Sequence, residues 1–263
     1  MKVTFLGTGG GRFVMIDQLR ATGGFIVESK NLNMHVDPGP GALVRAKQFH
    51  KNLKRLNSIF VSHPHTDHYT DMEVIIEAMT KGAKIKKGFL ITSKSVINPD
   101  KNENKTISKY HLDTLEKYYS LDPDEEIHFL NTTLKTTKCF HREEKCIGFV
   151  LEDEKKIGYT ADGEYYEEQV NYFKDCECLI INCLRPRYAK PYGHMTADKA
   201  RILIGQTKPK LAILQHFGMK MIFGVAEKEA KWIEQETGVK TIAARDGQVF
   251  ELKEKTKSLE NFN

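Results

Sequence analysis

The most constraining feature of this 263-residue chain is a short segment, residues 62–71, with the sequence SHPHTDHYTD. It places three imidazoles and a carboxylate within six positions, directly after an apolar run typical of a buried strand. His63 and His65 lie two residues apart and can face one metal ion, whereas Asp67 and His68 follow about one turn later and can face a second. A flexible surface loop is the alternative for any single histidine, but the combination predicts a site for two ions.

Three further candidate ligands occur where predicted strands end. His141, Asp162 and His216 each come within three residues of the end of an apolar, strand-like run. Such exits from strands into loops are where a rigid scaffold presents functional groups. Taken singly, each has another interpretation, because a histidine there is often structural and an aspartate before a glycine is often a turn or cap residue. It is the cluster at 62–71 that makes all three residues candidate metal ligands.

The order of predicted elements indicates the fold class. We expect strands at 3–6, 24–28, 34–36, 58–61, 88–92, 127–130, 134–140, 146–151, 156–159, 179–182, 211–214, 240–242 and 248–252. We expect helices at 41–49, 72–80, 108–119, 163–173, 197–205 and 227–237, and a polar linker at 98–105. This order predicts two sheets packed face to face with helices outside. Residues 1–252 are predicted to form a single domain, and the charged tail 253–263 is predicted to fray.

Composition excludes several classes of protein. With 40% hydrophobic and 29% charged residues, the chain is able to bury a core, which excludes disorder throughout. No apolar run reaches the roughly 18 residues that span a bilayer, and the chain opens on a strand-like run, so we predict a cytoplasmic protein without membrane contact. The five cysteines form no CxxC pair and are predicted to be buried hydrophobic side chains. The net charge of +5 permits an anionic substrate.

The candidate ligands, in their order along the chain, resemble those of a known superfamily. The pattern His63-x-His65-x-Asp67-His68, followed by His141, Asp162 and His216, resembles the ligand set of the metallo-β-lactamase superfamily of dinuclear hydrolases. The segments 5–9, 35–39 and 243–247 support the resemblance. It implies an α+β fold, a four-layer αββα sandwich of two mixed β-sheets with outer helices, and a metal site at one edge.

The resemblance also implies a division of the ligands. One ion is expected to take His63, His65 and His141, the other Asp67, His68 and His216, with Asp162 bridging both. Hydrolysis is then expected to proceed through a hydroxide that bridges the two ions, and Asp67 is counted among the catalytic residues as well as the ligands. Imidazole and carboxylate accept Zn²⁺, Mn²⁺ or Fe. We expect two divalent ions, with zinc favoured.

One segment indicates a branch within the superfamily. Residues 193–197, followed by 211–217, are similar to the ribonuclease Z branch and its phosphodiesterase relatives. His194 precedes a predicted helix whose N-cap is Thr196, so a phosphate there would meet free backbone N–H groups and an imidazole together. His194 is therefore predicted to be catalytic, stabilising the transition state or protonating the leaving group. The alternative is a structural histidine that bonds a loop carbonyl.

Two loops complete the predicted site. Segment 184–192 holds three cations and two aromatic rings between prolines, and Arg185 and Arg187 are predicted to bind substrate phosphates, unless the loop is simply solvated. The glycine run 7–12 ends in Arg12 where a dinucleotide-binding motif requires glycine, so it is predicted to approach the metal edge closely. The loop 9–14 and the segment 81–110 lack the substrate loop and long arm of tRNA-processing enzymes.

These observations predict a phosphodiesterase acting on RNA, other nucleic acids or nucleotides, and a homodimer is a possible assembly. The first alternative keeps the fold and the hydrolysis but changes the bond to a thioester, lactone or amide. An iron-dependent oxidoreductase and a non-catalytic nucleic-acid-binding module are further alternatives. The joint presence of Asp67, His68, Asp162 and His216 argues against a mononuclear or inactive site.

Overall fold

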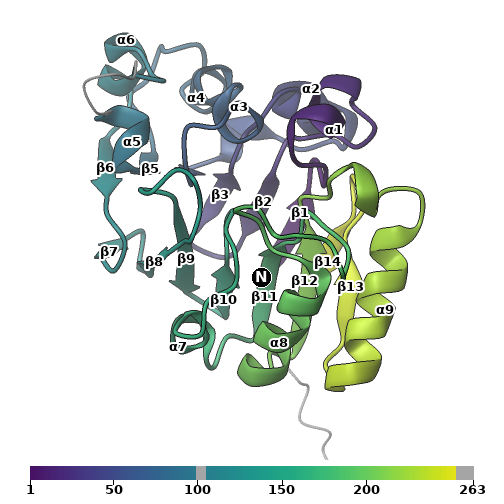
Figure 1. Ribbon diagram of the computed structural model, residues 1–263. Helices are drawn as coiled ribbons and strands as arrows, with labels where there is room; N and C mark the ends of the chain where they lie inside the picture. The colour runs from purple at the N-terminus through teal and green to yellow at the C-terminus, as the bar shows by residue number, and fades with distance from the viewer. Residues whose placement is uncertain (99–104, 253–263) are drawn as a thin grey trace, which may run out of the picture.

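The structure, a computed structural model, describes residues 1–98 and 105–252. It contains two seven-stranded sheets packed face to face, with helices on both outer sides (Figure 1). The first sheet, in spatial order, comprises β14 (Val249–Glu251), β1 (Lys2–Phe5), β2 (Phe25–Glu28), β3 (Asn33–Val36), β4 (Ser58–Val61), β5 (Phe89–Ser93) and β6 (Lys117–Leu121). The second comprises β13 (Thr241–Ala243), β12 (Leu211–Gln215), β11 (Cys178–Asn182), β10 (Lys156–Tyr159), β9 (Ile147–Glu152), β8 (Thr132–Lys138) and β7 (Glu126–Phe129).

The helices flank these sheets in two groups. The described α-helices are α1 (Arg12–Asp17), α2 (Ala42–Gln48), α3 (Thr66–Tyr69), α4 (Met72–Met79), α5 (Lys94–Ile97), α6 (Lys109–Asp113), α7 (Gln169–Phe173), α8 (Ala197–Thr207) and α9 (Val225–Thr237), with 3₁₀ turns η1 (Leu53–Arg55) and η2 (Met219–Met221). The purple and blue helices of the first half and the green and yellow helices of the second half lie on different sides of the strands (Figure 1). The predicted α+β sandwich of two mixed sheets with outer helices is confirmed.

Alternation along the central strands explains the layers. In β4, Phe60 lies in the cluster between the sheets, whereas Ile59 and Val61 pack with α2 and α4 on the outer side. The ring of Phe60 lies 4.9 Å from that of Phe149 in β9, and Tyr159 of β10 lies 5.4 Å from Phe149. Since successive side chains of a strand point to opposite faces, a strand covered on both faces is mostly apolar. All four residues of β4 are accordingly buried.

The parallel parts of the two sheets position the functional loops. Strands β3 to β6 pair in parallel in the first sheet, and β10 to β13 pair in parallel in the second. The carboxyl ends of parallel strands meet at one edge of a sheet, which is where ligands bind in open α/β sheets. The segments after β4, β10 and β12 therefore leave their sheets where side chains from both can meet.

Two predicted helices differ in the structure. The helix predicted at 108–119 ends at Asp113, and residues Lys117–Leu121 instead form β6, which pairs in parallel with β5. Two consecutive tyrosines in β6 favour a strand, and pairing with β5 overrides the weak helical pattern. The helix predicted at 163–173 begins only at Gln169, because Glu164 N–H donates to the carbonyl of Phe140 and joins a bridge between two loops.

Some predictions concern segments outside the described residues. Residues 99–104 of the predicted linker and the predicted frayed tail, 253–263, lie outside them, and both remain predictions, as does the single domain over 1–252. Within residues 1–98 and 105–252, no helix is long and apolar enough to cross a membrane.

A buried histidine makes the stability of this fold depend on pH. His35 of β3 is fully buried, and its Nε2–H donates to the Gly23 carbonyl at 2.8 Å. Burial lowers the pKa of His35 from 6.5 to about 4. Because the folded-state pKa lies below the unfolded value, the unfolded chain binds the proton first as the pH falls from 6.5 towards 4, and stability is lost in that window.

We predict that metal-free wild type loses a few kcal/mol of unfolding free energy between pH 7 and pH 4 through this one group, since each pKa unit is worth about 1.4 kcal/mol. His35→Gln keeps an N–H for Gly23 but cannot titrate, so its urea-denaturation curves should shift less with pH than those of wild type. Identical pH dependence in the two proteins would contradict the assignment.

Candidate metal centre

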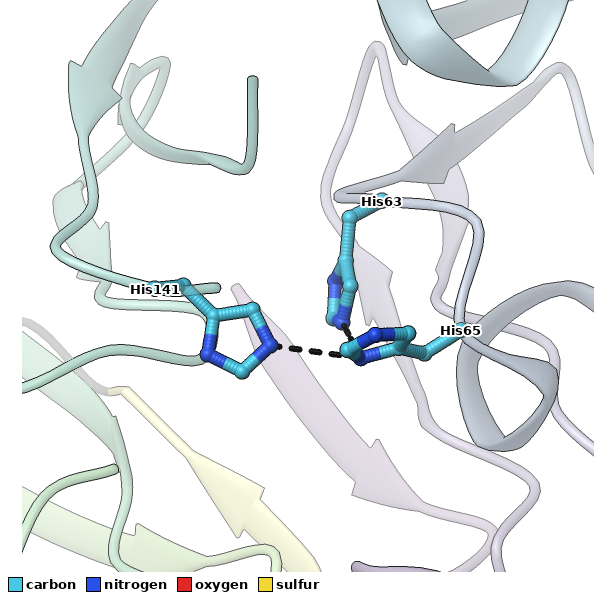
Figure 2. Close-up of side chains that lie close together, drawn as sticks. All are labelled: His63, His65 and His141. Atoms are coloured by element: carbon cyan, nitrogen blue, oxygen red, sulfur yellow. Dashed lines mark hydrogen bonds between the residues drawn. The ribbon is translucent and has the colours of Figure 1, made fainter. Parts of the chain in front are cut away.

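Every candidate ligand lies where a chain leaves a sheet. His63 and His65 follow β4, and Asp67 and His68 occupy the short helix α3. From the second sheet come three further side chains, beyond β8, β10 and β12 respectively: His141, Asp162 and His216. Figure 2 shows His63 and His65 projecting from one loop while His141 approaches from the segment after β8. The structure therefore brings together all seven side chains proposed from the sequence.

Three histidines form the first group. The distance from His63 Nε2 to His65 Nδ1 is 2.8 Å, and that from His141 Nε2 to His65 Nδ1 is 3.2 Å (Figure 2). A tetrahedron with zinc–nitrogen bonds of about 2.0–2.1 Å separates its ligand atoms by about 3.3 Å. The three ring nitrogens are thus gathered at a spacing that suits one tetrahedral ion.

A second group contains Asp67, His68 and His216. His216 Nε2 lies 3.1 Å from His68 Nε2 and 3.3 Å from Asp67 Oδ2. Asp162 lies between the two groups: its Oδ2 is 3.5 Å from His68 Nε2, its Oδ1 is 3.3 Å from His216 Nδ1, and it also clusters with His63. A carboxylate in that position can contact ions held by either group.

The pKa shifts of His63 and Asp162 favour a bound cation. Burial lowers the pKa of His63 well below its usual value, which keeps the ring neutral. Burial opposes ionisation of Asp162, but His216, His68 and His194 outweigh it and hold the pKa of that carboxyl well below its usual range. Neutral imidazole and ionised carboxylate are the forms that bind metal ions.

An unpartnered atom supports the same conclusion. His216 Nδ1 is buried and makes no hydrogen bond, although Asp162 Oδ1 lies 3.3 Å away. A buried polar atom without a hydrogen-bond partner is destabilising unless a ligand, water or ion interacts with it. The side chains therefore fit a pair of divalent ions, and imidazole with carboxylate is compatible with zinc, manganese or iron.

Hydrogen bonds at the far ring nitrogens orient three of the ligands. His141 Nδ1–H donates to the Gly193 carbonyl at 2.7 Å. His63 Nδ1 lies 2.9 Å from Ser62 Oγ, and His68 Nδ1 lies 2.9 Å from Asp37 Oδ2. Such partners fix the ring and leave Nε2 for the ion. Sequence reasoning missed Asp37 as a partner, and its only signal was the Asp-Pro-Gly turn after a strand.

The glycine run borders this site, as predicted from its residues. Gly11 N–H donates to Asp67 Oδ2 at 2.8 Å. A Cβ on Gly10 would lie 2.3 Å from Cγ of the His216 ring, so only glycine fits there. The prediction of a close-approach loop beside the metal edge is confirmed.

His194 lies against the same carboxylate. Its Nδ1 is 3.4 Å from Asp162 Oδ2, and its side chain is 20% exposed. Burial lowers the pKa of His194 to about 4. Because His194, His141 and Asp162 also form a group with ligand spacing, the geometry allows His194 to contact an ion as well as a substrate. The sequence predicted free N–H groups at the start of α8 for a phosphate. The first of them, that of Ala197, is instead occupied, because it donates to the Arg185 carbonyl.

The two predicted phosphate-binding arginines have partners within the protein. Arg185 Nη1 donates to the Lys190 carbonyl at 3.0 Å, which folds the loop on itself. Arg187 pairs with Glu229 of α9 at 3.1 Å and lies 3.9 Å above the ring of Trp232. These contacts give Arg187 a clear role in anchoring the loop to α9. Substrate binding by either arginine stays a prediction.

Comparison with solved structures identifies the class of fold. The metallo-β-lactamase fold protein YhfI from Bacillus subtilis matches with a TM-score of 0.77 at 21% identity, over 95% of this chain and 98% of that one. A diphosphatase of the PhnP family matches with a TM-score of 0.69 at 16% identity over 96% and 98%. The short form of human tRNase Z matches with a TM-score of 0.66 at 16% identity over 96% and 100%. The fold is that of the metallo-β-lactamases.

Sequence comparison gives the family. The profile of the β-lactamase superfamily domain matches residues 32–217. An uncharacterized protein of Methanocaldococcus jannaschii is 40% identical over 255 residues, 96% of this chain and 95% of that protein. The probable metallo-hydrolase YhfI of Bacillus subtilis is 26% identical over 239 residues, 89% and 93% of the two chains. The chain belongs to the β-lactamase superfamily, as its ligand pattern predicted.

Gly10 provides a test of the second ligand group. We predict that Gly10→Ala displaces the His216 ring and lowers the amount of metal bound per chain relative to wild type, measured by elemental analysis after dialysis against zinc. Gly205→Ala is the matched control, because a Cβ there meets only Thr237 at 3.5 Å and alanine favours a helix. Equal metal content in the two variants would show that His216 does not contribute to an ion site.

Proposed function

We propose that this protein is a dinuclear metal-dependent phosphodiesterase that acts on phosphodiester bonds of nucleic acids or nucleotides. One observation carries the proposal: Asp162 lies between two groups of ligands, and His194 is 3.4 Å from the same carboxylate. A metal pair with an adjacent imidazole suits in-line displacement at phosphorus, since such a pair can stabilise both the attacking and the leaving oxygen. The family supports hydrolase activity, and the phosphodiester bond is our inference.

Each ligand has a proposed place. His63, His65 and His141 hold one ion, and Asp67, His68 and His216 hold the other, with Asp162 shared. Bound ions of this kind, for which we propose zinc, supply Lewis acidity towards the phosphoryl group and lower the pKa of water towards neutrality. Asp67 has a second role, because the N–H of Gly11 binds its Oδ2 and ties the glycine loop to the site.

His194 is the proposed group for substrate chemistry. The imidazole of His194 lies beside Asp162, and the carbonyl of the preceding residue, Gly193, orients His141. The loop that carries Gly193 and His194 therefore positions the rings of His194 and His141. We propose that His194 stabilises charge on a phosphoryl oxygen or protonates the leaving group. Arg185, in the same loop, is the proposed contact for a neighbouring phosphate.

Two solved structures with this fold support the proposed substrate class. Their names include a diphosphatase and a tRNase Z, which are enzymes of phosphorus–oxygen bonds. Thioesters and lactones are included in the activity test because the first alternative predicts their hydrolysis instead. A cytoplasmic location and a homodimer stay predictions from the sequence.

Asp162 tests the dinuclear arrangement. We predict that wild type saturated with zinc or manganese binds two ions per chain. Asp162→Ala should lower the affinity for each of the two ions, because the shared carboxylate is a ligand of both. Isothermal titration of the metal-free proteins measures each site. Asp122→Ala, at a carboxylate paired with Lys94 and outside the site, is the control. Two undisturbed sites in Asp162→Ala would exclude a bridging role.

His194 tests the phosphodiesterase assignment. With bis(p-nitrophenyl) phosphate and short RNAs, we predict that His194→Ala lowers kcat by about 10²–10⁴-fold while its metal content stays at the wild-type value. His128→Ala, at an exposed histidine of β7, should leave kcat unchanged. Loss of metal from His194→Ala would make His194 a ligand. Turnover of thioesters or lactones alone by wild type would replace the phosphodiesterase proposal.

A further inference from the structure

A chain of buried hydrogen bonds runs from the second sheet to the first beneath the candidate metal centre. Gln215 Nε2–H donates to Asn182 Oδ1 at 2.7 Å, Asn182 Nδ2–H donates to Tyr159 Oη at 3.1 Å, and Tyr159 Oη–H donates to Asp37 Oδ2 at 2.7 Å. Asn182 Nδ2 also donates to Asp162 Oδ1, at 2.8 Å. All five side chains are buried.

Chemistry fixes the direction of this chain. An ionised carboxylate only accepts, so the single hydroxyl proton of Tyr159 goes to Asp37 and its oxygen is left to accept from Asn182. The amide nitrogen of Asn182 carries two protons, one for Tyr159 and one for Asp162. Burial and the neighbouring carboxylates of Asp37 and Asp162 raise the pKa of Tyr159 well above its usual value, which keeps the hydroxyl proton in place.

The chain ends on the carboxylate that orients two candidate ligands. Asp37 Oδ2 accepts from His68 Nδ1 at 2.9 Å and from Ser62 Oγ at 2.8 Å, and Ser62 Oγ in turn lies 2.9 Å from His63 Nδ1. Since Ser62 gives its proton to Asp37, its oxygen accepts from His63. One carboxylate thus sets the ring orientation of a ligand in each group.

Core packing does not explain the hydroxyl of Tyr159. Its ring is fully buried and lies 5.2 Å from the ring of Phe25 and 5.4 Å from that of Phe149. Phenylalanine would fill this aromatic cluster equally well. It would also bury no hydroxyl, and burying a hydroxyl without a hydrogen-bond partner costs free energy. The hydroxyl is useful at this place only through Asp37 and Asn182.

We propose that Tyr159 and Asn182 are positioning residues that couple the ligands from the two sheets, holding Asp162 at one end and His63 and His68, through Asp37, at the other. The proposal rests on the proposed function in one respect, namely that these ligands bind metal ions. Outer partners of metal ligands commonly contribute about 10–100-fold to metal affinity. Neither residue touches a substrate in this account, so their effect is exerted through the ligands alone.

Tyr159→Phe is the principal test. It keeps the ring in the aromatic cluster and removes one donor from Asp37 and one acceptor from Asn182. Tyr172→Phe is a matched control, because Tyr172 also donates a hydroxyl proton to a carboxylate, that of Asp124, at 2.6 Å and outside the site. The measurements are zinc affinity by competition with a chromophoric chelator, the visible spectrum of the Co²⁺-loaded proteins, and thermal unfolding of the metal-free proteins.

We expect Tyr159→Phe to bind zinc about 10–100-fold more weakly than wild type and to show an altered Co²⁺ spectrum, while Tyr172→Phe matches wild type in both. Asn182→Asp replaces an amide that donates two hydrogen bonds by a carboxylate of the same shape that only accepts, so it should lose more zinc affinity than Tyr159→Phe. If Asn182→Asp does not fold, Tyr159→Phe alone is the test. Equal affinity and equal spectra in the two tyrosine variants, with only thermal stability lowered, would overturn the proposal. Failure of wild type to bind two ions would instead refute the proposed function.

Discussion

The packing of the two sheets determines whether the candidate ligands can meet. The ring of Phe60 in β4 lies 6.5 Å from that of Tyr159 in β10, and each ring precedes a ligand, His63 and Asp162, by three residues. The segments that follow β4 and β10 therefore leave the core at neighbouring points, and both lead to the candidate metal centre. Protein interiors are packed as densely as organic crystals, so an aromatic contact of this kind fixes the separation of the strands within narrow limits. Ligand distances of about 3 Å between the two sheets depend on that contact.

The site concentrates polar side chains where apolar ones would be more stable. Burial lowers the pKa of His63, whereas three carboxylates raise the pKa of His68 well above its usual value against the effect of burial. Buried imidazoles and carboxylates this close together are stable only because hydrogen bonds and opposite charges compensate for lost hydration. A cation that binds the folded protein but not the unfolded chain then stabilises the fold by mass action. Function and stability are linked here through the same side chains.

Sequence patterns predicted the ligands because ligand chemistry is local. Segment 62–71 follows β4 and carries four side chains that the structure places in the two groups, and the strand ends before His141 and Asp162 were recognisable from apolar runs. Most strands and the long helices were predictable for the same reason, since period and length are local properties. The sequence did not reveal β6, because that strand depends on pairing with β5, nor α1, which begins at Arg12 and whose N-cap residue, Gly11, has no side chain to cap it. Partners such as Asp37 and Asn182 depend on contacts between distant segments, which no local pattern encodes.

Backbone conformation explains why even a correct set of ligands did not give the geometry. Asp37, Ala161 and His216 have φ values of 49°, 51° and 60°, in the left-handed region that residues other than glycine rarely adopt. Each lies just after a strand, where a left-handed residue turns the chain sharply and redirects the next side chains out of the pleat. Such conformations cost about 1–3 kcal/mol each and persist only where surrounding contacts enforce them. Aspartate and histidine adopt this region more often than most residues, but even they do so rarely, and alanine gives no signal for it. The turns that direct Asp162 and His216 into the site therefore follow from the tertiary structure.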